Sequence, residues 1–319
     1  MAAETTSSSP TPPPTGIVVD AHLAYSLCAY VDGPHSGSPP SGWDEIWVPA
    51  KPKRLPGNYA IVFQAQAQPT LLALAIQGTQ DFKDILEDFH VVPQRPFPPI
   101  EGAAIAAGSH GGLHDLLELA GTYKGAPTTL GSLLGSIPAG SSLLVTGHSL
   151  GGNLASVMAP WIAANVAAFG PNPTPLASLP KNLTTITFAA PTAGNAAFAQ
   201  FLDANPERYR AHFNRNDVVS NVWAQSGPLR ISNIDGLFPW PGPSPAPPFV
   251  QELLTRKIGE MAGAHPPVSY TQTHGFIFEF PPAPSSNTTP AEAWLWELGY
   301  QHNYAYCQQF LGPDAGCKP

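Results

Sequence analysis

Residues 141–158 read S-S-L-L-V-T-G-H-S-L-G-G-N-L-A-S-V-M, and this stretch decides the fold of the 319-residue chain. Leu143, Leu144 and Val145 form an apolar run that is typical of a buried strand. Beyond Gly152, apolar residues recur at the spacing of one helix face, at Leu154, Val157, Met158, Trp161 and Ile162. The stretch therefore predicts a strand, a tight turn and a helix, with Ser149 on the turn inside a G-x-S-x-G pentapeptide.

The chemistry of this turn favours a nucleophilic serine. Gly147 and Gly151 remove the Cβ clashes that such a turn would create, and the turn pushes the Ser149 Oγ into the open. Backbone N–H groups at the start of a helix can stabilise a developing oxyanion beside the serine. In a chain with 29 glycines the pentapeptide alone is weak, and the alternative is a glycine-rich turn with an incidental serine. The flanking strand and helix favour the nucleophile.

Composition narrows the class of protein. Hydrophobic residues make up 43% of the chain, enough for a sizeable core, whereas only 11% are charged, against roughly 25% in typical domains. The formal net charge of -8 argues against a nucleic-acid partner and against a polybasic membrane anchor. No apolar run approaches roughly 18 residues, so we expect no transmembrane segment. Without C-x-x-C or Cys/His metal spacing, we expect no metal and no cofactor.

The chain divides into a tail and one expected domain. Residues 1–16 form a Pro/Ser/Thr tail that we expect to be disordered, and they lack the basic start and apolar centre of a signal peptide. Residues 17–319 are expected to form a single α/β domain. Within it, the proline-rich region of about 226–290 is expected to be an irregular insertion.

Periodicity along this domain alternates between strand and helix. We expect a helix over 22–31, loops over 32–57, strands over 59–64 and 71–77 joined as a hairpin, a helix opening at 113–119, strands over 183–188 and 209–213 with a helix over 196–203 between them, and a helical region over 291–311. This alternation around the serine turn is typical of an α/β fold.

A serine nucleophile needs a base and a carboxylate that orients the base, and in α/β hydrolases the chain order is Ser, Asp or Glu, then His. Asp217 directly follows an apolar strand, in H-F-N-R-N-D-V-V, where a sheet presents functional residues. The alternative is a turn residue paired with Arg215. Asp203 lies late in a helix pattern, and Asp235 lies in a turn signal. Asp217 is the favoured carboxylate.

Three histidines follow Ser149 in the chain. His265 precedes a Pro-Pro pair, His274 precedes a glycine and a short apolar run, and His302 follows a Gly-Tyr break before the last helix. Histidine suits the role of base because its pKa lies near the working pH. Chain order alone does not separate His274 from His302.

Four motifs together resemble the class 3 lipases, the filamentous-fungal type of triacylglycerol lipase. They are A-I-Q-G-T at a strand end, G-H-S-L-G-G, N-R-N-D, and a C-terminal histidine followed by tyrosines. The resemblance runs from about residue 59 to the C-terminus and is weakest in the proline-rich insertion. It implies an α/β-hydrolase fold, with a central mostly parallel sheet flanked by helices. It also implies Ser149 as nucleophile, Asp217 as its carboxylate, and His302 rather than His274 as base.

The resemblance also assigns the oxyanion hole. Its two donors fall on Thr79, after the strand-end glycine, and on the backbone N–H of Leu150. One departure is that Gln77 stands where the family usually has an arginine.

A lid helix is implied over 80–92. Its apolar stripe consists of Phe82, Ile85, Leu86 and Phe89, opposite an acidic face. Such a helix can cover an apolar cleft in water and turn outward at a lipid surface. The alternative is a helix that is packed permanently on the sheet.

The three cysteines leave the disulfide pairing open. The resemblance implies a bond between Cys28 and Cys317 that ties the first helix to the C-terminus. Cys307 is then left over, although it could instead pair with Cys28, and three free thiols are a further alternative.

We therefore expect a serine carboxylic-ester hydrolase, a lipase that cleaves acylglycerol esters through an acyl-enzyme on Ser149. Its expected partner is a lipid or ester substrate. The lid implies that the protein acts at a lipid–water interface. Alternatives on the same fold are a short-chain or phenolic-acid esterase, a phospholipase A1 and an acyltransferase. A non-catalytic protein that binds lipid or a partner is the alternative from another class. The pattern sets neither oligomeric state nor compartment, although the resemblance favours an extracellular protein.

Overall fold

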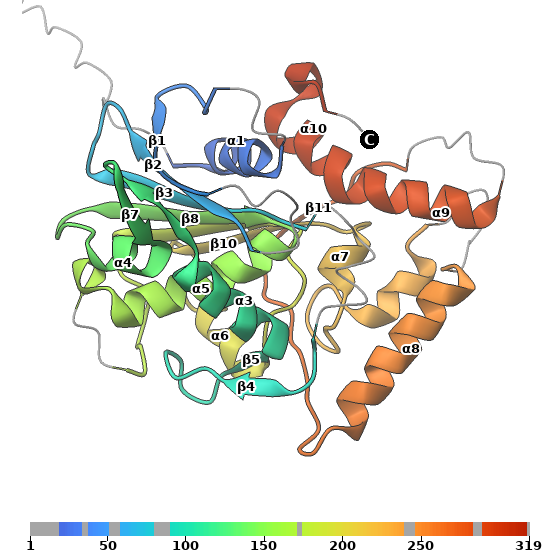
Figure 1. Ribbon diagram of the computed structural model, residues 1–319. Helices are drawn as coiled ribbons and strands as arrows, with labels where there is room; N and C mark the ends of the chain where they lie inside the picture. The colour runs from blue at the N-terminus through green and yellow to red at the C-terminus, as the bar shows by residue number, and fades with distance from the viewer. Residues whose placement is uncertain are drawn as a thin grey trace, which may run out of the picture.

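The computed structural model describes residues 19–33, 38–50, 58–79, 90–170, 174–238, 246–282 and 289–317. Within these ranges a nine-stranded sheet forms the centre of the molecule, in the order β11-β10-β9-β8-β3-β2-β1-β6-β7 (Figure 1). Its strands are β1 (Trp43–Pro49), β2 (Ala60–Ala65), β3 (Leu71–Ile76), β6 (Ala120–Tyr123), β7 (Ala126–Thr129), β8 (Ser142–His148), β9 (Leu183–Phe188), β10 (Tyr209–Asn214) and β11 (Phe276–Phe278).

Five adjacent strands, β3, β8, β9, β10 and β11, run parallel, whereas β1, β2, β6 and β7 pair antiparallel with their neighbours. The parallel register sets Ile76 opposite Gly147, and His148 opposite Phe188. The carboxyl ends of β3, β8 and β10 therefore meet at one edge of the sheet, the edge at which parallel sheets place their functional residues.

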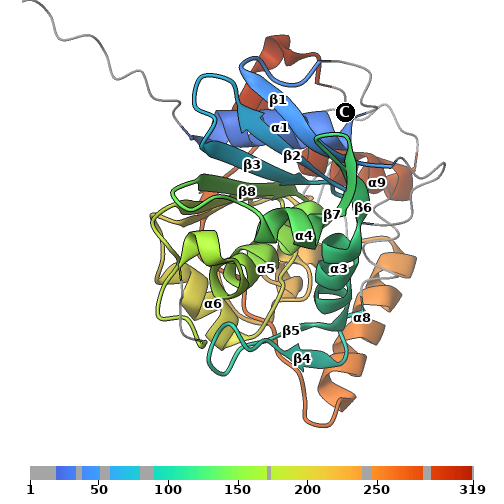
Figure 2. The same ribbon diagram turned by 60° about the vertical axis from the view of Figure 1, so that its left-hand side comes forward.

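Helices cover both faces of the sheet, as Figures 1 and 2 show. One face carries α1 (Ala21–Asp32) and α10 (Ala305–Leu311), and the other carries α3 (Ala107–Glu118), α4 (Leu130–Gly135), α5 (Leu150–Asn165) and α6 (Ala196–Asp203). Each face has its own apolar core. The larger core packs α3 and α5 on the sheet, and the smaller one packs α1 against β2, β3 and β8.

Further elements complete the described structure. They are the two-stranded sheet of β4 (Gln94–Pro96) and β5 (Ala104–Ala106), α7 (Val218–Asn221), α8 (Pro248–Gly263), α9 (Pro290–Gly299), a π-helical turn Tyr300–Tyr304 and the 3₁₀ turns Ala167–Phe169, Ile231–Gly236 and Pro313–Ala315. A third apolar cluster, which includes Trp223, Met261 and Trp294, joins α7, α8 and α9.

The sequence predicted this architecture well. A mostly parallel sheet flanked by helices is confirmed, and the expected strands over 59–64, 71–77, 183–188 and 209–213 correspond to β2, β3, β9 and β10. The helices expected over 22–31, 113–119, 196–203 and 291–311 are present as well. That residues 17–319 form a single domain stays a prediction.

Two expectations for secondary structure were wrong. The loop-rich region 32–57 contains β1, in which Trp43 and Trp47 are buried while Asp44 and Glu45 face outward. The many prolines around this strand concealed its alternation. The expected irregular insertion over about 226–290 contains the 16-residue helix α8, which starts with Pro248 in its first turn. Its buried stripe includes Val250, Leu254 and Met261, at helical spacing.

The expected disulfide between Cys28 and Cys317 is also wrong. Cys307 pairs with Cys317 across a sequence separation of 10. Cys28 is a free thiol, fully buried on the inner face of α1, with its Sγ 3.2 Å from the Thr146 Oγ1. Its thiol faces β8, and the disulfide closes within the C-terminal segment instead.

Two expectations fall outside the described residues. These are the tail over 1–16 and most of the expected lid, including Phe82, Ile85, Leu86 and Phe89. Among the helices of the described ranges, none combines the length and the apolar character that a membrane span requires.

Candidate active site

Ser149 lies on the turn between β8 and α5, with φ 58° and ψ −129°. A positive φ is costly for a non-glycine residue, and such strain is concentrated at functional sites. The turn is tight enough to require glycine on both sides. A Cβ on Gly147 would lie 2.2 Å from backbone atoms of Gly151, and a Cβ on Gly151 would lie 2.2 Å from the Ile76 carbonyl oxygen. The expected strand–turn–helix around Ser149 is therefore present.

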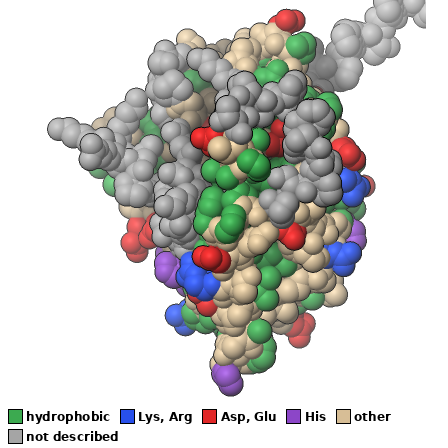
Figure 3. Space-filling model, turned by 90° about the vertical axis from the view of Figure 1, so that its right-hand side faces the viewer, with side chains coloured by type: hydrophobic (Ala, Val, Ile, Leu, Met, Phe, Trp, Pro, Cys, Tyr) green, Lys and Arg blue, Asp and Glu red, His purple; other side chains and the backbone are tan. Residues whose placement is uncertain are grey.

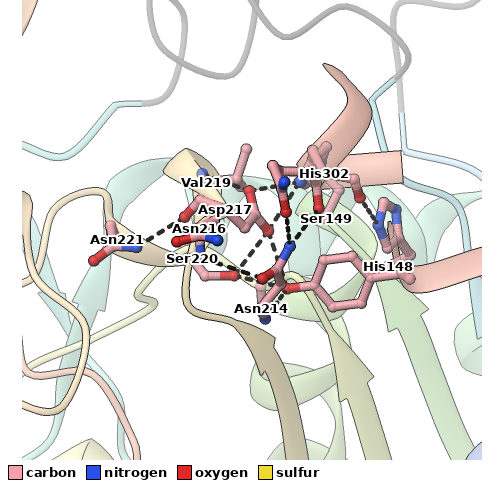
Figure 4. Close-up of polar contacts among 12 residues, drawn as sticks. His148, Ser149, Asn214, Asn216, Asp217, Val219, Ser220, Asn221 and His302 are labelled. Atoms are coloured by element: carbon pink, nitrogen blue, oxygen red, sulfur yellow. Dashed lines mark hydrogen bonds and ion pairs between the residues drawn. The ribbon is translucent and has the colours of Figure 1, made fainter. Parts of the chain in front are cut away.

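His302 contacts Ser149 on one side and Asp217 on the other (Figure 4). Its Nε2 lies 2.9 Å from the Ser149 Oγ, and its Nδ1 lies 3.0 and 3.1 Å from the two carboxylate oxygens of Asp217. The imidazole comes from the π-helical turn between α9 and α10, and such turns are frequent at functional sites. These contacts have the geometry of a nucleophile, a base and an orienting carboxylate.

Asp217 is fully buried, and it is surrounded by hydrogen-bond donors. It caps α7 by accepting from the Val219 N–H at 2.9 Å, and it also accepts from the Ser220 hydroxyl at 2.9 Å and from the Tyr306 hydroxyl at 3.0 Å. A buried charge is tolerated only when it is hydrogen-bonded in this way. The alternative pairing with Arg215 is wrong, because Arg215 faces Glu279 with its Nε 3.6 Å from the Oε2.

Tyr306 is a supporting residue to which the sequence assigned no role. Its hydroxyl donates to Asp217 and accepts from the Asn214 N–H at 2.7 Å, so it connects the end of β10 to the carboxylate. Burial, and then the negative charge of Asp217, raise the pKa of Tyr306 well above its usual value, which keeps the phenol a neutral donor. The tyrosines after His302 were the only sequence signal for this contact.

The two expected oxyanion donors lie at the same edge. A Cβ on Gly78 would be 2.7 Å from the His148 carbonyl oxygen and 3.1 Å from the Ser149 Cβ, so the chain that leads into Thr79 runs directly beside the serine turn. Leu150 is the first residue of α5, where backbone N–H groups have no partner within the helix. Gln77, which replaces the usual arginine, is buried and donates from its Nε2 to the Val31 carbonyl at 2.9 Å.

The other candidates lie elsewhere. His274 contacts Asp203, with its Nδ1 2.7 Å from the Oδ2, on the surface. Asp235 accepts from the Gln251 side chain, and the His265 Nδ1 lies 2.8 Å from the Gly263 carbonyl oxygen. The structure thus brings His302, and not His274, to Ser149.

Comparison with known proteins finds a family likeness over part of the chain. Residues 73–226 match the family model described as Lipase (class 3), a range that holds Ser149, Asp217, Thr79 and Leu150. A search of curated proteins gave no match. Over residues 73–226 the chain is therefore similar to the class 3 lipases, and this likeness supports a carboxylic ester hydrolase.

One solved structure supports the fold, and two others match with lower TM-scores. M37 lipase superposes with a TM-score of 0.69 at 22% identity, over 91% of this chain and 92% of that one. A lipase from Rhizopus microsporus var. chinensis has a TM-score of 0.44 at 21% identity, over 62% of this chain and 64% of its own. A triacylglycerol lipase described as having a serine protease triad has a TM-score of 0.45 at 20% identity, over 62% and 69%.

Proposed function

We propose that this protein is a lipase that hydrolyses acylglycerol esters through an acyl-enzyme on Ser149. The observation that carries the proposal is the continuous chain of contacts from the Ser149 Oγ through both ring nitrogens of His302 to the buried Asp217 carboxylate. A serine hydroxyl is a weak nucleophile at neutral pH, and this arrangement supplies both the base and its orienting group.

The reaction follows from this geometry. His302 Nε2 takes the proton of Ser149 as the Oγ attacks the ester carbonyl carbon, and Asp217 stabilises the imidazolium that forms. The Thr79 donors and the Leu150 N–H hold the oxyanion of the tetrahedral intermediate. The bond to the alcohol oxygen then breaks, and His302 protonates the departing alcohol. A water molecule, deprotonated by His302, then attacks the acyl carbonyl carbon. The bond to the Ser149 Oγ breaks as His302 returns the proton to that oxygen, and the fatty acid is released.

A lipid substrate is supported by the surface on the side of α8 and α9. Phe249 and Ile258 of α8 and Leu295 of α9 are all exposed large hydrophobic residues. Figure 3 shows hydrophobic side chains gathering in the middle of this face, with Lys and Arg towards its sides. Exposed apolar patches commonly mark interaction sites, and this one suits a lipid–water interface. The lid over 80–92 stays part of the proposal on its sequence pattern.

A fluorophosphonate probe tests the nucleophile. We expect the wild-type protein to be labelled at one serine and Ser149→Ala to remain unlabelled. A matched control is Ser156→Ala, in a later turn of α5. This variant should be labelled like the wild-type protein. Equal labelling of Ser149→Ala, or none of the wild type, would contradict the assignment.

Hydrolysis of a series of esters from acetyl to oleoyl tests the substrate class. A lipase should favour long acyl chains, and its rate should rise as triacylglycerol passes its solubility limit. Preference for acetyl esters without that rise would indicate an esterase, and preference for the sn-1 ester of a phospholipid would indicate a phospholipase A1.

A further inference from the structure

A second aspartate–histidine contact lies beside the catalytic site, between Asp32 and His148. Asp32 is the last residue of α1, and its Oδ2 lies 3.7 Å from the His148 Nδ1. An acidic side chain at the C-terminal end of a helix has the unfavourable sign for the helix dipole. A residue that breaks a local rule in this way is expected to be retained for another purpose.

Asp32 holds the strand end that leads to the oxyanion hole. Its Oδ1 accepts a hydrogen bond of 2.8 Å from the N–H of Gly78, the residue before Thr79. The neighbouring Gln77 is held by the same helix end, because its side chain donates to the Val31 carbonyl. The C-terminus of α1 therefore fixes this segment at two successive residues.

His148 holds the turn that carries the base. It directly precedes Ser149, and its Nε2 lies 2.8 Å from the backbone carbonyl oxygen of His302. A carbonyl oxygen only accepts, so Nε2 carries the proton. The 3.7 Å between the His148 Nδ1 and the Asp32 Oδ2 is too long for a hydrogen bond, so each side chain acts on its own backbone partner. The ring also packs against the His302 ring, with centroids 4.8 Å apart, and edge-on against Tyr306 at 5.5 Å.

We propose that Asp32 and His148 are positioning residues of the hydrolytic site, which hold the oxyanion strand end and the turn of His302 in register across Ser149. This inference rests on the proposed ester hydrolysis. Neither side chain touches the reacting atoms. Asp32 acts through the backbone N–H of Gly78, which adjoins Thr79, and His148 acts through the backbone carbonyl of His302.

The charges around Asp32 connect this pair to the reaction. Burial raises the pKa of Asp32 to about 7, opposed by the Gly78 N–H and by the positive charge of His302. Burial, and then His302, lower the pKa of His148 to about 3, so His148 stays neutral. From α1, Tyr25 and Cys28 also face this site, and burial raises the pKa of both groups, which keeps them neutral.

The direction of the pH effect follows. Above about pH 7 Asp32 is a carboxylate, which is the stronger acceptor for the Gly78 N–H, and the imidazolium that His302 becomes during catalysis favours this ionised form. Below that pH Asp32 binds a proton and holds Gly78 less firmly. As the pH falls, activity should therefore be lost through protonation of Asp32 in addition to protonation of the base.

The test uses the full chain, a soluble short-chain ester and the concentration of sites titrated with a fluorophosphonate. For Asp32→Ala we expect kcat per titrated site to fall roughly 10–100-fold with KM within twofold, because small displacements of catalytic groups have effects of that size. Asp32→Asn keeps an acceptor for Gly78 but cannot ionise. Its kcat per titrated site should recover most of the wild-type value. In a plot of log kcat/KM against pH, the fall on the acidic side (the acid limb) should show one ionisation fewer than in the wild type.

The matched control is Asp203→Asn, in the exposed Asp203–His274 pair, which should leave kcat and the acid limb unchanged. His148→Leu should lower kcat about tenfold, whereas His148→Gln, which can still donate to the His302 carbonyl, should recover part of that loss. If Asp32→Ala does not fold, the inference is tested by the pH profile of Asp32→Asn and by the kcat values of the two His148 variants.

Two results would overturn the inference: a kcat per titrated site within twofold of wild type in Asp32→Ala or His148→Leu, or an unchanged acid limb in Asp32→Asn. Both are separate from failure of the proposed function, in which the wild-type protein itself would neither be labelled nor hydrolyse esters.

Discussion

Asp217–His302 and Asp203–His274 are two aspartate–histidine pairs in one protein, and the shorter contact belongs to the pair outside the active site. The His274 Nδ1 lies 2.7 Å from the Asp203 Oδ2, whereas the His302 Nδ1 lies 3.0 Å from the Asp217 Oδ1. The difference lies in their surroundings. The side chain of His274 is 81% exposed, whereas that of His302 is 5% exposed and that of Asp217 is 0% exposed.

Burial changes what such a pair can do. In water, charges at this distance interact weakly and are screened by salt, whereas a dry site strengthens every electrostatic interaction within it. The buried pair also has a nucleophile on the far side of the imidazole and hydroxyl and N–H donors around its carboxylate. In the exposed pair the His274 imidazole lies largely in solvent, although the Asp203 carboxylate still accepts from the His274 backbone N–H at 2.8 Å. The distance between aspartate and histidine is therefore a poor guide to function. A third group on the far side of the imidazole, here the Ser149 hydroxyl, is a better guide.

The largest expected effect separates the two histidines. His302→Ala should lower kcat by about 10⁵–10⁶-fold, because it removes the base for Ser149. His274→Ala should leave kcat within twofold. Steady-state kinetics on a soluble ester, normalised to correctly folded protein by circular dichroism, gives both values. A comparable loss in His274→Ala would erase the distinction between the pairs.

The two aspartates should differ by a smaller factor. Asp217→Asn should reduce kcat about 10⁴-fold, since the amide favours the wrong tautomer of His302 and leaves its cation without a partner. Asp203→Asn is the matched change in the exposed pair and should be silent in the same assay. If Asp217→Asn retained more than a tenth of the wild-type kcat, Asp217 would not be the orienting carboxylate.

A further difference is that only the buried pair has an expected oxyanion hole near its nucleophile. Thr79→Val removes the hydroxyl and keeps the backbone N–H, and we expect kcat to fall about 10²-fold with little change in KM. Thr79→Ser, which keeps the hydroxyl, is the control. Equal rates for the two variants would leave only the backbone group of Thr79 in that role.

The donors around Asp217 can be removed one at a time. Tyr306→Phe removes one hydrogen bond to the carboxylate and leaves the buried Asn214 N–H without its acceptor. We expect about 1–3 kcal/mol less stability to unfolding and a fall in kcat of about tenfold. Urea unfolding and kinetics measure the two effects, and Tyr304→Phe, in the adjoining π-helical turn, is a control. Unchanged stability would show that the phenol is not needed to satisfy these groups.

The smallest effect concerns the exposed pair itself. Asp203→Asn should change the free energy of unfolding by about 0–1 kcal/mol, and the difference should shrink as salt is added. Thermal unfolding at low and high ionic strength measures this. A salt-independent loss of several kcal/mol would mean that the pair contributes to the fold as strongly as a buried one.

The sequence predicted the candidate site better than it predicted its support. Ser149 could be chosen from a local strand–turn–helix pattern that the chain displays within a few residues, whereas Thr79 and Leu150 were implied by the resemblance to the class 3 lipases and stay predictions. Asp217 could be chosen because it follows a strand directly. His302 could not be separated from His274 by pattern, because the choice depends on which of two distant segments packs over the sheet edge.

The disulfide, β1 and α8 show the same limit. Cys28 and Cys317 looked compatible in sequence, yet Cys28 is buried against Thr146 and Cys317 lies beside Cys307. Proline-rich flanks concealed both β1 and α8, because a proline indicates only that one backbone N–H is missing. Whether the neighbouring residues bury a stripe depends on the surfaces that they meet.

What the sequence by itself determined was the serine turn, the order of the triad candidates and the alternation of strand and helix, because these depend on contacts between near neighbours in the chain. Only the tertiary structure decided which histidine meets Ser149, which donors surround Asp217, and that the end of α1 lies against the strand end before Thr79. Those contacts join segments up to 153 residues apart, as in the contact between Ser149 and His302. They exist only after the sheet and its two helical layers have packed.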